Sequence, residues 1–332
     1  MWYSAVGLMV TLTLSLLAAP LTAEAQPRRK IPLVGMLLSG SLPGSSGSAR
    51  CTDYFRQALR DLGYVEGQDI ALEYRYADNQ FDRLPALAAE LVRLTPEVIW
   101  TNSNAAGLAA KQAITTIPVV IGVSQDLMEL GVVENLARPG GNVTGLDLRV
   151  FALMGKRLEL LKDAVPTLAR VAVIVNPTDP HYKEVPHNIA REARALGVQL
   201  QRVEASGPET FAGAFAAMIQ GGADAVMLPE GPPFGAHMPR LLELAHRHRL
   251  PTMCSGVHYA EAGCLLTYGA AADDLCQRSA VFVDKILKGA KPANLPVESG
   301  YKFYLIVNLK TAEALGLTLP PTFLPRADEV IK

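Results

Sequence analysis

The chain has 332 residues, of which 49 % are hydrophobic and 19 % are charged, and its formal net charge is −1. This composition supplies enough apolar material for one large domain or two medium ones. A net charge near zero gives no general electrostatic attraction to nucleic acid or anionic lipid. We therefore expect no nucleic-acid partner.

The amino-terminal residues 1–25 are typical of a secretory signal. An uncharged apolar run over 5–19 is followed by Pro20 and by Ala23-Glu24-Ala25, which has the form of a cleavage site. The run is shorter than the roughly 20 residues of a membrane-spanning helix, and no comparable run follows it. We expect cleavage near Ala25 and Gln26, export to the periplasm, and a mature chain that does not span the membrane. An uncleaved helical anchor is the alternative.

After the signal, short apolar β-rich runs alternate with amphipathic helical stretches. In chain order, this pattern predicts strands over 31–39, 69–78, 97–103 and 118–124, with helices over 49–64, 81–95, 104–115 and 127–137. Pro139-Gly140-Gly141 then interrupts the last of these helices, and a short strand follows. A boundary between domains is expected near 138–149.

The same series then restarts. We expect strands within 169–180, 198–206, 223–231 and 250–256, and helices over 187–197, 209–222 and 237–249. The repeated order predicts an α/β protein with two doubly wound, parallel-sheet, Rossmann-like lobes of about 120 residues each.

Polar residues gather where the predicted strands end. Ligands of open parallel sheets bind beyond the carboxyl ends of the strands, so we expect these residues to converge on one ligand cleft. In the first half they are Ser39, Gly40, Ser41, Asn102, Ser103, Asn104, Ser124, Gln125 and Asp126; in the second half they are Asn176, Thr178, Glu230, Gly231 and Ser255. For each Ser or Asn alone, capping of the next helix is the alternative.

Asp126 is the most specific of these candidates. Its carboxylate could pair with the ammonium group of a ligand, while hydroxyls and N–H groups at a helix N-terminus hold a carboxylate. Together these groups would form an amino acid site. The alternative is that Asp126 caps the helix predicted over 127–137.

The sequence lacks the usual signatures of catalysis and cofactor binding. It contains no dinucleotide fingerprint, no phosphate loop, no G-x-S-x-G elbow and no Cys/His pair with zinc spacing. We therefore expect no catalytic residue, no cofactor and no metal site, and we expect that the protein is not an enzyme.

Export makes disulfides a consideration for the four cysteines. Cys254 and Cys264 lie on consecutive predicted strands and could form a disulfide, whereas the sequence does not decide whether Cys51 and Cys276 pair. The alternative is that all four are small buried apolar side chains.

Several segments together resemble a known family. The segments 62–78, 81–93, 111–126, 137–146, 283–298 and 305–321 are similar to the substrate-binding proteins of ABC transporters that are often described as tryptophan/tyrosine-type. The resemblance extends over nearly all of residues 31–332. The Gly-Asp-Pro that is usual in this family appears here as Gln125-Asp126-Leu127, so the Asp matches and its neighbours differ.

The resemblance implies the type I periplasmic binding fold, in which two lobes joined by three connections close on a ligand. It implies a first lobe of 26–147 plus about 268–296 and a second lobe of 148–267 plus about 297–332. Tyr268, which stands where the family has Tyr-Gly-Pro, and Asp273 in the segment after it join the expected ligand-binding residues.

The implied function is that of the extracytoplasmic solute-binding component of an ABC importer. Such a protein captures a small solute by hinge closure and delivers it to a permease with its ATPase. The solute expected here is an amino acid or a similar molecule, with aromatic amino acids as candidates, and the protein is expected to be a monomer. The alternatives are a ligand-sensing subunit of a signalling receptor and an exported α/β hydrolase or transferase.

Overall fold

The computed structural model describes residues 31–40, 48–78, 80–177, 185, 187–229, 234–299 and 302–332, and for 48–50 it describes the backbone alone. The predicted signal segment 1–25 lies outside the described residues. So do four of the expected ligand-binding residues, Ser41, Thr178, Glu230 and Gly231.

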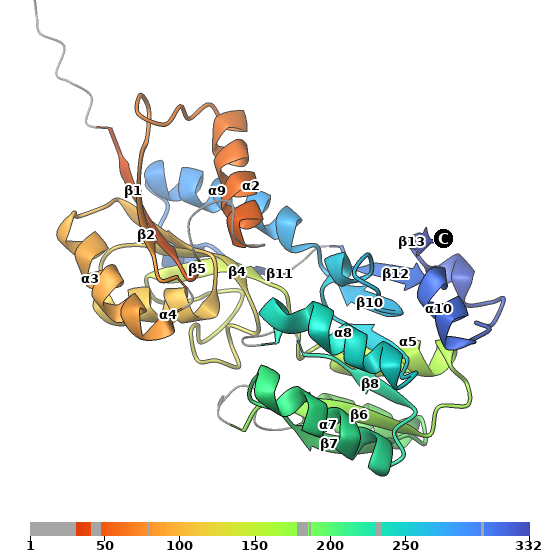
Figure 1. Cartoon of the computed structure of the whole chain (residues 1–332). Coiled ribbons are helices and arrows are strands. Elements are labelled where there is room, and N and C mark those ends of the chain that lie inside the picture. The colour runs from red at the N-terminus through yellow and green to blue at the C-terminus, as the bar shows by residue number, and fades with distance from the viewer. Residues whose placement is uncertain are drawn as a thin grey trace, which may run out of the picture. The chain divides into compact units, whose positions relative to one another are not determined.

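The described chain contains two sheets, each covered by helices on both faces (Figure 1). The first lobe contains β1 (Leu33–Leu38), α2 (Ser48–Asp61), β2 (Ala71–Tyr76), α3 (Leu84–Arg93), β3 (Val98–Thr101), α4 (Asn104–Ala113), β4 (Val119–Ser124), β5 (Val143–Asp147), α9 (Ala272–Leu287) and β11 (Glu298–Ser299). Its strand order is β11-β5-β4-β3-β1-β2, and every pair is parallel.

The second lobe contains α5 (Met154–Ala164), β6 (Arg170–Val175), α6 (His187–Ala195), β7 (Gln199–Glu204), α7 (Pro208–Gln220), β8 (Ala225–Met227), α8 (Met238–Arg247), β9 (Thr252–Cys254), β10 (Leu266–Gly269), β12 (Tyr304–Asn308), α10 (Leu309–Leu315) and β13 (Glu329–Ile331). Its strand order is β13-β12-β10-β9-β8-β6-β7. The pairs are parallel except for β10 with β12, which is antiparallel.

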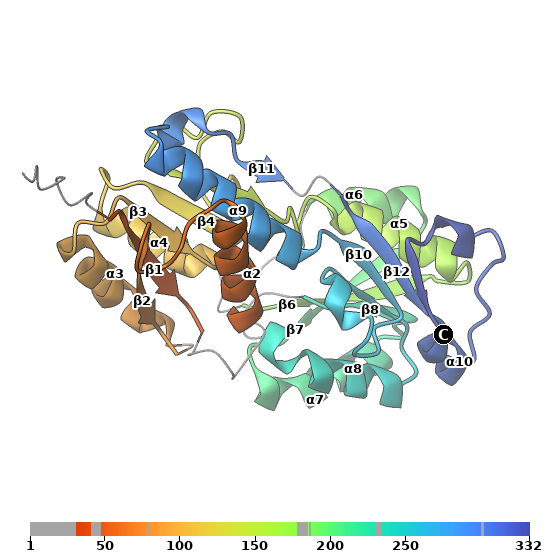
Figure 2. The ribbon, with the colours of Figure 1, turned by 90° about the horizontal axis from the view of Figure 1, so that it is seen from above.

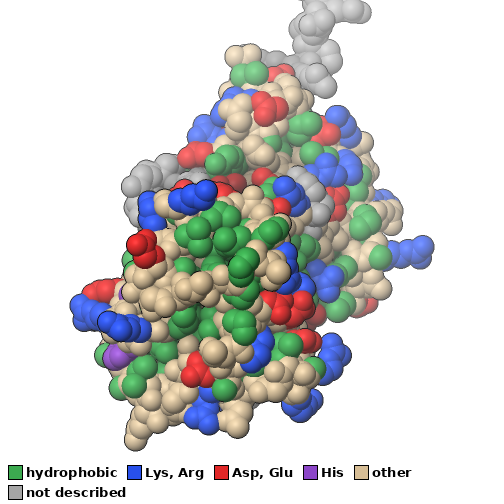
Figure 3. Space-filling model, turned by 90° about the vertical axis from the view of Figure 1, so that its right-hand side faces the viewer, with side chains coloured by type: hydrophobic (Ala, Val, Ile, Leu, Met, Phe, Trp, Pro, Cys, Tyr) green, Lys and Arg blue, Asp and Glu red, His purple; other side chains and the backbone are tan. Residues whose placement is uncertain are grey.

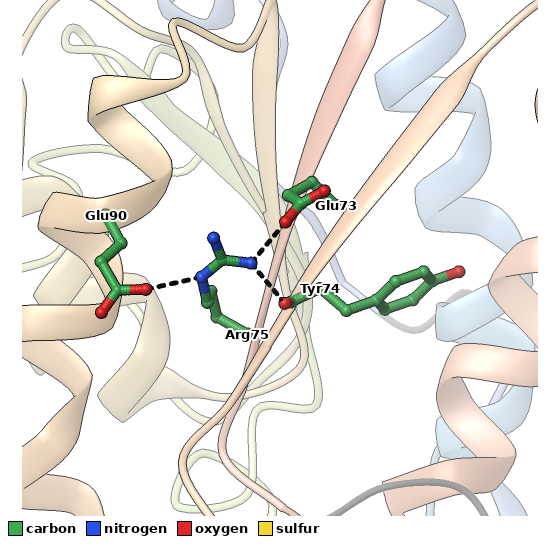
Figure 4. Close-up of polar contacts among 4 residues, drawn as sticks. All are labelled: Glu73, Tyr74, Arg75 and Glu90. Carbon is green, nitrogen blue, oxygen red and sulfur yellow. Dashed lines mark hydrogen bonds and ion pairs between the residues drawn. The ribbon is translucent and has the colours of Figure 1, made fainter.

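Successive side chains of the central strands point to opposite faces of each sheet, as the pleat requires. In β1, Met36 joins the core under α2 and α9, and Leu37 joins the core under α3 and α4. Figure 4 shows the same alternation in β2, the edge strand. Arg75 turns toward α3, where its Nε donates to Glu90 at 2.7 Å, and the Tyr74 ring points to the opposite face.

The chain passes between the two sheets three times. β5 and β11 belong to the first sheet, and β6, β10 and β12 belong to the second, so the chain crosses over 148–153, over 270–271 and between β11 and β12 (Figure 2). The helix α9 packs on α2, although more than 200 residues separate them in the sequence.

The return of α9 to the first lobe is supported by buried contacts. The Trp100 ring of β3 stacks on Phe55 of α2 with the centroids 4.3 Å apart, and its Nε1 donates to Ser279 Oγ of α9 at 2.8 Å. A disulfide joins Cys51 of α2 to Cys276 of α9. A second disulfide joins Cys254 at the end of β9 to Cys264 just before β10.

The helix predicted over 127–137 is wrong. The chain there forms turns, with Leu130 N–H donating to Asp126 O and Val132 N–H donating to Leu127 O. Asp126 has a φ of +57° and Gly131 a φ of +65°, and left-handed residues at both points do not continue an α-helix. The prediction that Asp126 caps this helix is wrong for the same reason.

The surface carries mixed charge. Figure 3 shows the side of the molecule that includes β13 and α10, where basic and acidic side chains are interspersed around a central group of hydrophobic ones. Among the described helices, none combines the length and the apolar character needed to cross a membrane.

Candidate ligand-binding site

A polar rim lies at the carboxyl edge of the first sheet, where β1, β3 and β4 are neighbours. Asn102 Oδ1 accepts from the Ser39 N–H at 3.1 Å, and the hydroxyls of Ser39 and Ser103 are hydrogen-bonded to each other. Asn104 and Gln125 are joined by two bonds: Asn104 Nδ2 donates to Gln125 O at 2.8 Å, and Gln125 N–H donates to Asn104 Oδ1 at 3.0 Å. These five residues form a pre-organised edge, which we call the first-lobe rim.

The rim surrounds the start of α4. Ser103 is the N-cap residue, and its hydroxyl accepts from the Ala106 N–H at 3.2 Å. Capping therefore occurs at Ser103, as the alternative to a ligand role predicted, and Ser103 remains part of the rim as well. Asn102, Ser103, Asn104 and Gln125 are all half-buried. Backbone N–H groups of the first helical turn attract anions, so this edge is chemically suited to a carboxylate.

Two other expected rim residues turn inward. Ser124 is 1 % exposed, and its hydroxyl donates to Leu146 O at 2.5 Å. Gly40 is buried, and its carbonyl accepts from the Asp78 N–H at 3.2 Å. Both residues lie at the strand ends that the sequence predicted, but they stabilise the edge from inside.

Asp126 is also buried, with 1 % of its surface exposed. Its Oδ2 accepts from the N–H of Phe151, in the first connection, at 2.8 Å. Burial raises the pKa of the Asp126 carboxyl to about 7; the Asp147 and Glu129 carboxylates act in the same direction, and the Phe151 N–H opposes them. The carboxylate thus contacts the connection between the lobes and is not part of the rim surface.

Asp147 organises the same region. Its Oδ1 accepts from the N–H groups of Asp126 and Arg149, and its Oδ2 accepts from the N–H of Leu127, each at 2.8 Å. Such a carboxylate satisfies three backbone donors at the end of β5. It holds the left-handed turn at Asp126 in place.

The carboxyl edge of the second sheet is different. An apolar hollow lies at the ends of the neighbouring strands β6, β8 and β9 beside α5. Its lining is Val150, Phe151, Met154, Arg157, Val173, Ile174, Val175, Met227, Leu228, Pro229, Met253 and Ser255. Most of these side chains are apolar, so the hollow suits an apolar group.

The remaining expected residues take different places. Ser255 lines the hollow and is 7 % exposed, and Asn176, directly after β6, is 4 % exposed. The Tyr268 carbonyl accepts a hydrogen bond from Arg157, and its ring lies 6.1 Å from that of Phe303. Asp273 stands in the first turn of α9, where a carboxylate stabilises the helix dipole.

Sequence reasoning missed Phe151, Met154 and Arg157, which line the hollow. Arg157 looks like a surface residue in a charged helix, yet it is 3 % exposed. A signal was present, because Arg157 stands three, four and seven residues before Leu160, Leu161 and Ala164, which is the spacing of a buried helix face.

Within the described part of the chain, no group of three or more His, Cys, Asp or Glu side chains is placed to hold a metal ion. The chemistry at the two edges is that of noncovalent binding: hydrogen-bonding groups on one edge and an apolar hollow on the other.

Comparisons with known proteins agree with this picture. A model of the family described as ABC transporter substrate binding protein matches residues 46–331. A similar sequence is the tyrosine-binding protein of Clostridioides difficile (strain R20291), which is 24 % identical over 263 residues, covering 79 % of this chain and 75 % of that protein.

Solved structures share the fold. The ABC domain from Streptococcus pneumonia in complex with L-Trp is 21 % identical with a TM-score of 0.80, over 90 % of this chain and 99 % of that one. A ligand-free, open substrate binding protein with adhesive properties from Clostridium difficile is 22 % identical with a TM-score of 0.71, over 91 % of this chain and 100 % of that one. These likenesses confirm the predicted fold class, two α/β lobes of the type I periplasmic binding architecture.

Proposed function

The chain belongs to the ABC transporter substrate binding protein family, and from this premise we propose that it captures an amino acid with an aromatic side chain outside the cytoplasm. Hinge closure of the two lobes then presents the bound solute to a permease and its ATPase. In this proposal the protein is an exported monomer that releases its solute chemically unchanged.

The observation that carries the proposal is the contrast between the two carboxyl edges. The first-lobe rim offers hydrogen-bonding groups around the start of α4, which suit the ligand carboxylate. The second-lobe hollow is mainly apolar, and Phe151, Met154 and Leu228 would pack against the ligand side chain. A solute with a charged head and an apolar side chain uses both edges when the lobes close.

The relatives support this ligand class. One is named for binding tyrosine, and a structural neighbour was solved with L-Trp. Aromatic amino acids match both the rim and the hollow of this chain, whereas sugars would leave the apolar lining without a partner.

Isothermal titration calorimetry of the purified protein tests the proposal with L-Trp, L-Tyr, L-Phe, L-Ala and two analogues. Tryptamine lacks the carboxylate, and indole-3-propionate lacks the ammonium group. We expect the aromatic amino acids to bind, L-Ala to bind weakly and tryptamine to lose binding. Failure of all three aromatic amino acids to bind would refute the proposed ligand class.

Mass spectrometry of the solute recovered from the complex addresses the enzyme alternative. The recovered mass should equal the mass supplied. A transport assay with the cognate permease in proteoliposomes then separates import from sensing, because a purely sensory subunit would not stimulate uptake.

A further inference from the structure

Arg157 is a buried cation in the second lobe that joins the first connection between the lobes to the end of β10, from which the second connection leaves. It lies on α5 and is 3 % exposed. Its Nε donates to the carbonyl of Tyr268 at 2.7 Å, and its Nη1 donates to the carbonyl of Val150 at 2.6 Å. Val150 is in the first connection, and Tyr268 is the penultimate residue of β10, just before the second connection.

The surroundings of Arg157 accommodate this double contact. A Cβ atom on Gly269 would lie 2.1 Å from the Ser255 carbonyl oxygen and 3.5 Å from Arg157 Nη2, so a glycine is needed for the close approach of these backbones. Ala270 and Gly256, also small, line a second hollow beside Arg157. The guanidinium therefore sits where the two connections come together.

Burying a guanidinium is unfavourable unless its donors are satisfied, and an apolar side chain would fill the same space with less desolvation. Core packing alone therefore does not account for an arginine here, whereas the planar fork of N–H donors can fix two carbonyls relative to each other.

Other side chains hold the first connection alone. Asn188 Nδ2 donates to the carbonyls of Phe151 and Ala152 at 2.5 and 3.1 Å, and Asp126 accepts from the Phe151 N–H. Arg157 differs because it also binds Tyr268 at the end of β10, directly before the second connection. Its loss would leave the first connection anchored but uncoupled from the second.

We propose that Arg157 is a positioning residue that couples the first and second connections, so that they turn together when the lobes close. The coupling narrows the range of lobe separations in the ligand-free protein and keeps the binding-competent arrangement well populated. This inference rests on the proposed function, because lobe closure is the motion by which the solute is captured.

The test measures the distance between the lobes. Spin labels on the introduced cysteines Arg93→Cys of α3 and Gln220→Cys of α7, both exposed, report on the first and second lobes. Pulsed electron paramagnetic resonance gives the distance distribution without solute and with saturating L-Trp. Arg157→Met removes both hydrogen bonds and keeps an apolar stem, and Arg157→Lys keeps the charge.

We expect Arg157→Met to broaden the ligand-free distribution and to leave the solute-bound distribution unchanged. Its affinity for L-Trp should fall about three- to tenfold, because a smaller fraction of the molecules is binding-competent. Arg157→Lys should give an intermediate width. Lys156→Met is the matched control on the same helix, since Lys156 pairs with Glu159 in a half-exposed position at 2.5 Å, and it should change neither distribution.

An unchanged ligand-free width in a folded Arg157→Met protein would overturn the proposal. If Arg157→Met does not fold, Arg157→Gln and Arg157→Lys replace it, and wild-type widths in both would overturn the proposal equally. A purely structural role would lower the melting temperature without broadening the distribution. The ligand-free comparison needs no solute, so failure of L-Trp to bind would count against the proposed function and leave the test of Arg157 intact.

Discussion

The carboxyl edges of the two sheets arise from the same strand–helix order, yet they differ in chemistry. In the first lobe, side chains at the strand ends are hydrogen-bonded to one another and to backbone groups. In the second lobe, the strand ends open into an apolar hollow. A shared topology thus fixes where a ligand binds, and the residues at each edge decide which part of the ligand it contacts.

The two disulfides extend the comparison, and they give the largest expected effect on stability. Cys51–Cys276 closes a loop with a sequence separation of 225 residues in the first lobe, and Cys254–Cys264 closes one of 10 residues in the second. By loop-closure entropy, losing the long-range bridge should lower the free energy of unfolding by about 5 kcal/mol, and losing the short one by about 3 kcal/mol.

Urea unfolding of the double variants Cys51→Ala/Cys276→Ala and Cys254→Ala/Cys264→Ala measures this difference. Each variant is compared with the wild type under oxidising conditions and again with reductant. A larger loss from the short bridge would show that local strand geometry, not chain entropy, dominates the effect of these disulfides.

Removal of the Asp147 carboxylate comes next in size. Asp147→Ala leaves three backbone N–H groups without their acceptor at a buried position, so we expect a loss of roughly 4 kcal/mol in the free energy of unfolding. Asp147→Asn keeps one carbonyl oxygen as acceptor and should lose less. Asp82→Ala, at an exposed position, is the control and should match the wild type in chemical denaturation.

The strand ends and the Asp147 turn show how much of the fold and the site can be predicted from the sequence. The alternation of strands and helices, the repeat of the series and the polar strand ends at Asn104 and Gln125 follow from periodicity and from strand chemistry. The carboxylate of Asp147 gave no such signal, because its role depends on a left-handed turn at Asp126 that local sequence does not reveal. The erroneous helix over 127–137 has the same origin: its apolar spacing is helical, but the tertiary hydrogen bonds of Asp147 select a turn.

Arg157 illustrates the other limit. A buried residue of α5 can be found from helical spacing, but its partners are the carbonyls of Val150 and Tyr268. Tyr268 is more than 100 residues away in the sequence, and backbone carbonyls exist at every position. Only the folded arrangement identifies which ones are bound.

The pH dependence of the free energy of unfolding tests the buried Asp126 at the edge of the first sheet. Its expected effect follows that of Asp147→Ala. The folded-state pKa of Asp126 is about 7, above its ordinary value of 3.8, so the folded protein holds the proton more tightly than the unfolded chain. The resulting stabilisation is complete below about pH 4 and is lost as the pH rises toward 7. Asp147 and Glu129 are the charged groups that raise this pKa in addition to burial.

Asp126→Asn removes this titration and keeps an oxygen acceptor for the Phe151 N–H. At about 1.4 kcal/mol per pKa unit, the wild type should lose on the order of 4 kcal/mol between pH 4 and pH 8 relative to the variant. Urea unfolding across that range measures the difference, with Asp82→Asn as the exposed control. Parallel pH profiles for the wild type and Asp126→Asn would show that this carboxyl does not titrate with a raised pKa.

The smallest expected effects are on ligand binding, and they separate the two edges most directly. Asn104→Ala removes both bonds to Gln125 at the rim, and Met154→Ala enlarges the hollow. If the rim holds the amino acid head group, Asn104→Ala should lower the affinities for L-Trp and L-Ala by a similar factor of about ten. This factor corresponds to the loss of roughly one hydrogen bond.

Met154→Ala should lower the affinity for L-Trp about tenfold and leave the affinity for L-Ala nearly unchanged, because L-Ala has no large side chain to place in the hollow. Calorimetric titration of both solutes against both variants gives four ratios of the variant's dissociation constant to that of the wild type. Asn135→Ala, in a surface turn, is the control. If Met154→Ala lowered the affinities for L-Trp and L-Ala equally, the hollow would support the lobe without contacting the solute. That result would refute the hypothesis that the polar edge binds the head group and the apolar edge binds the side chain.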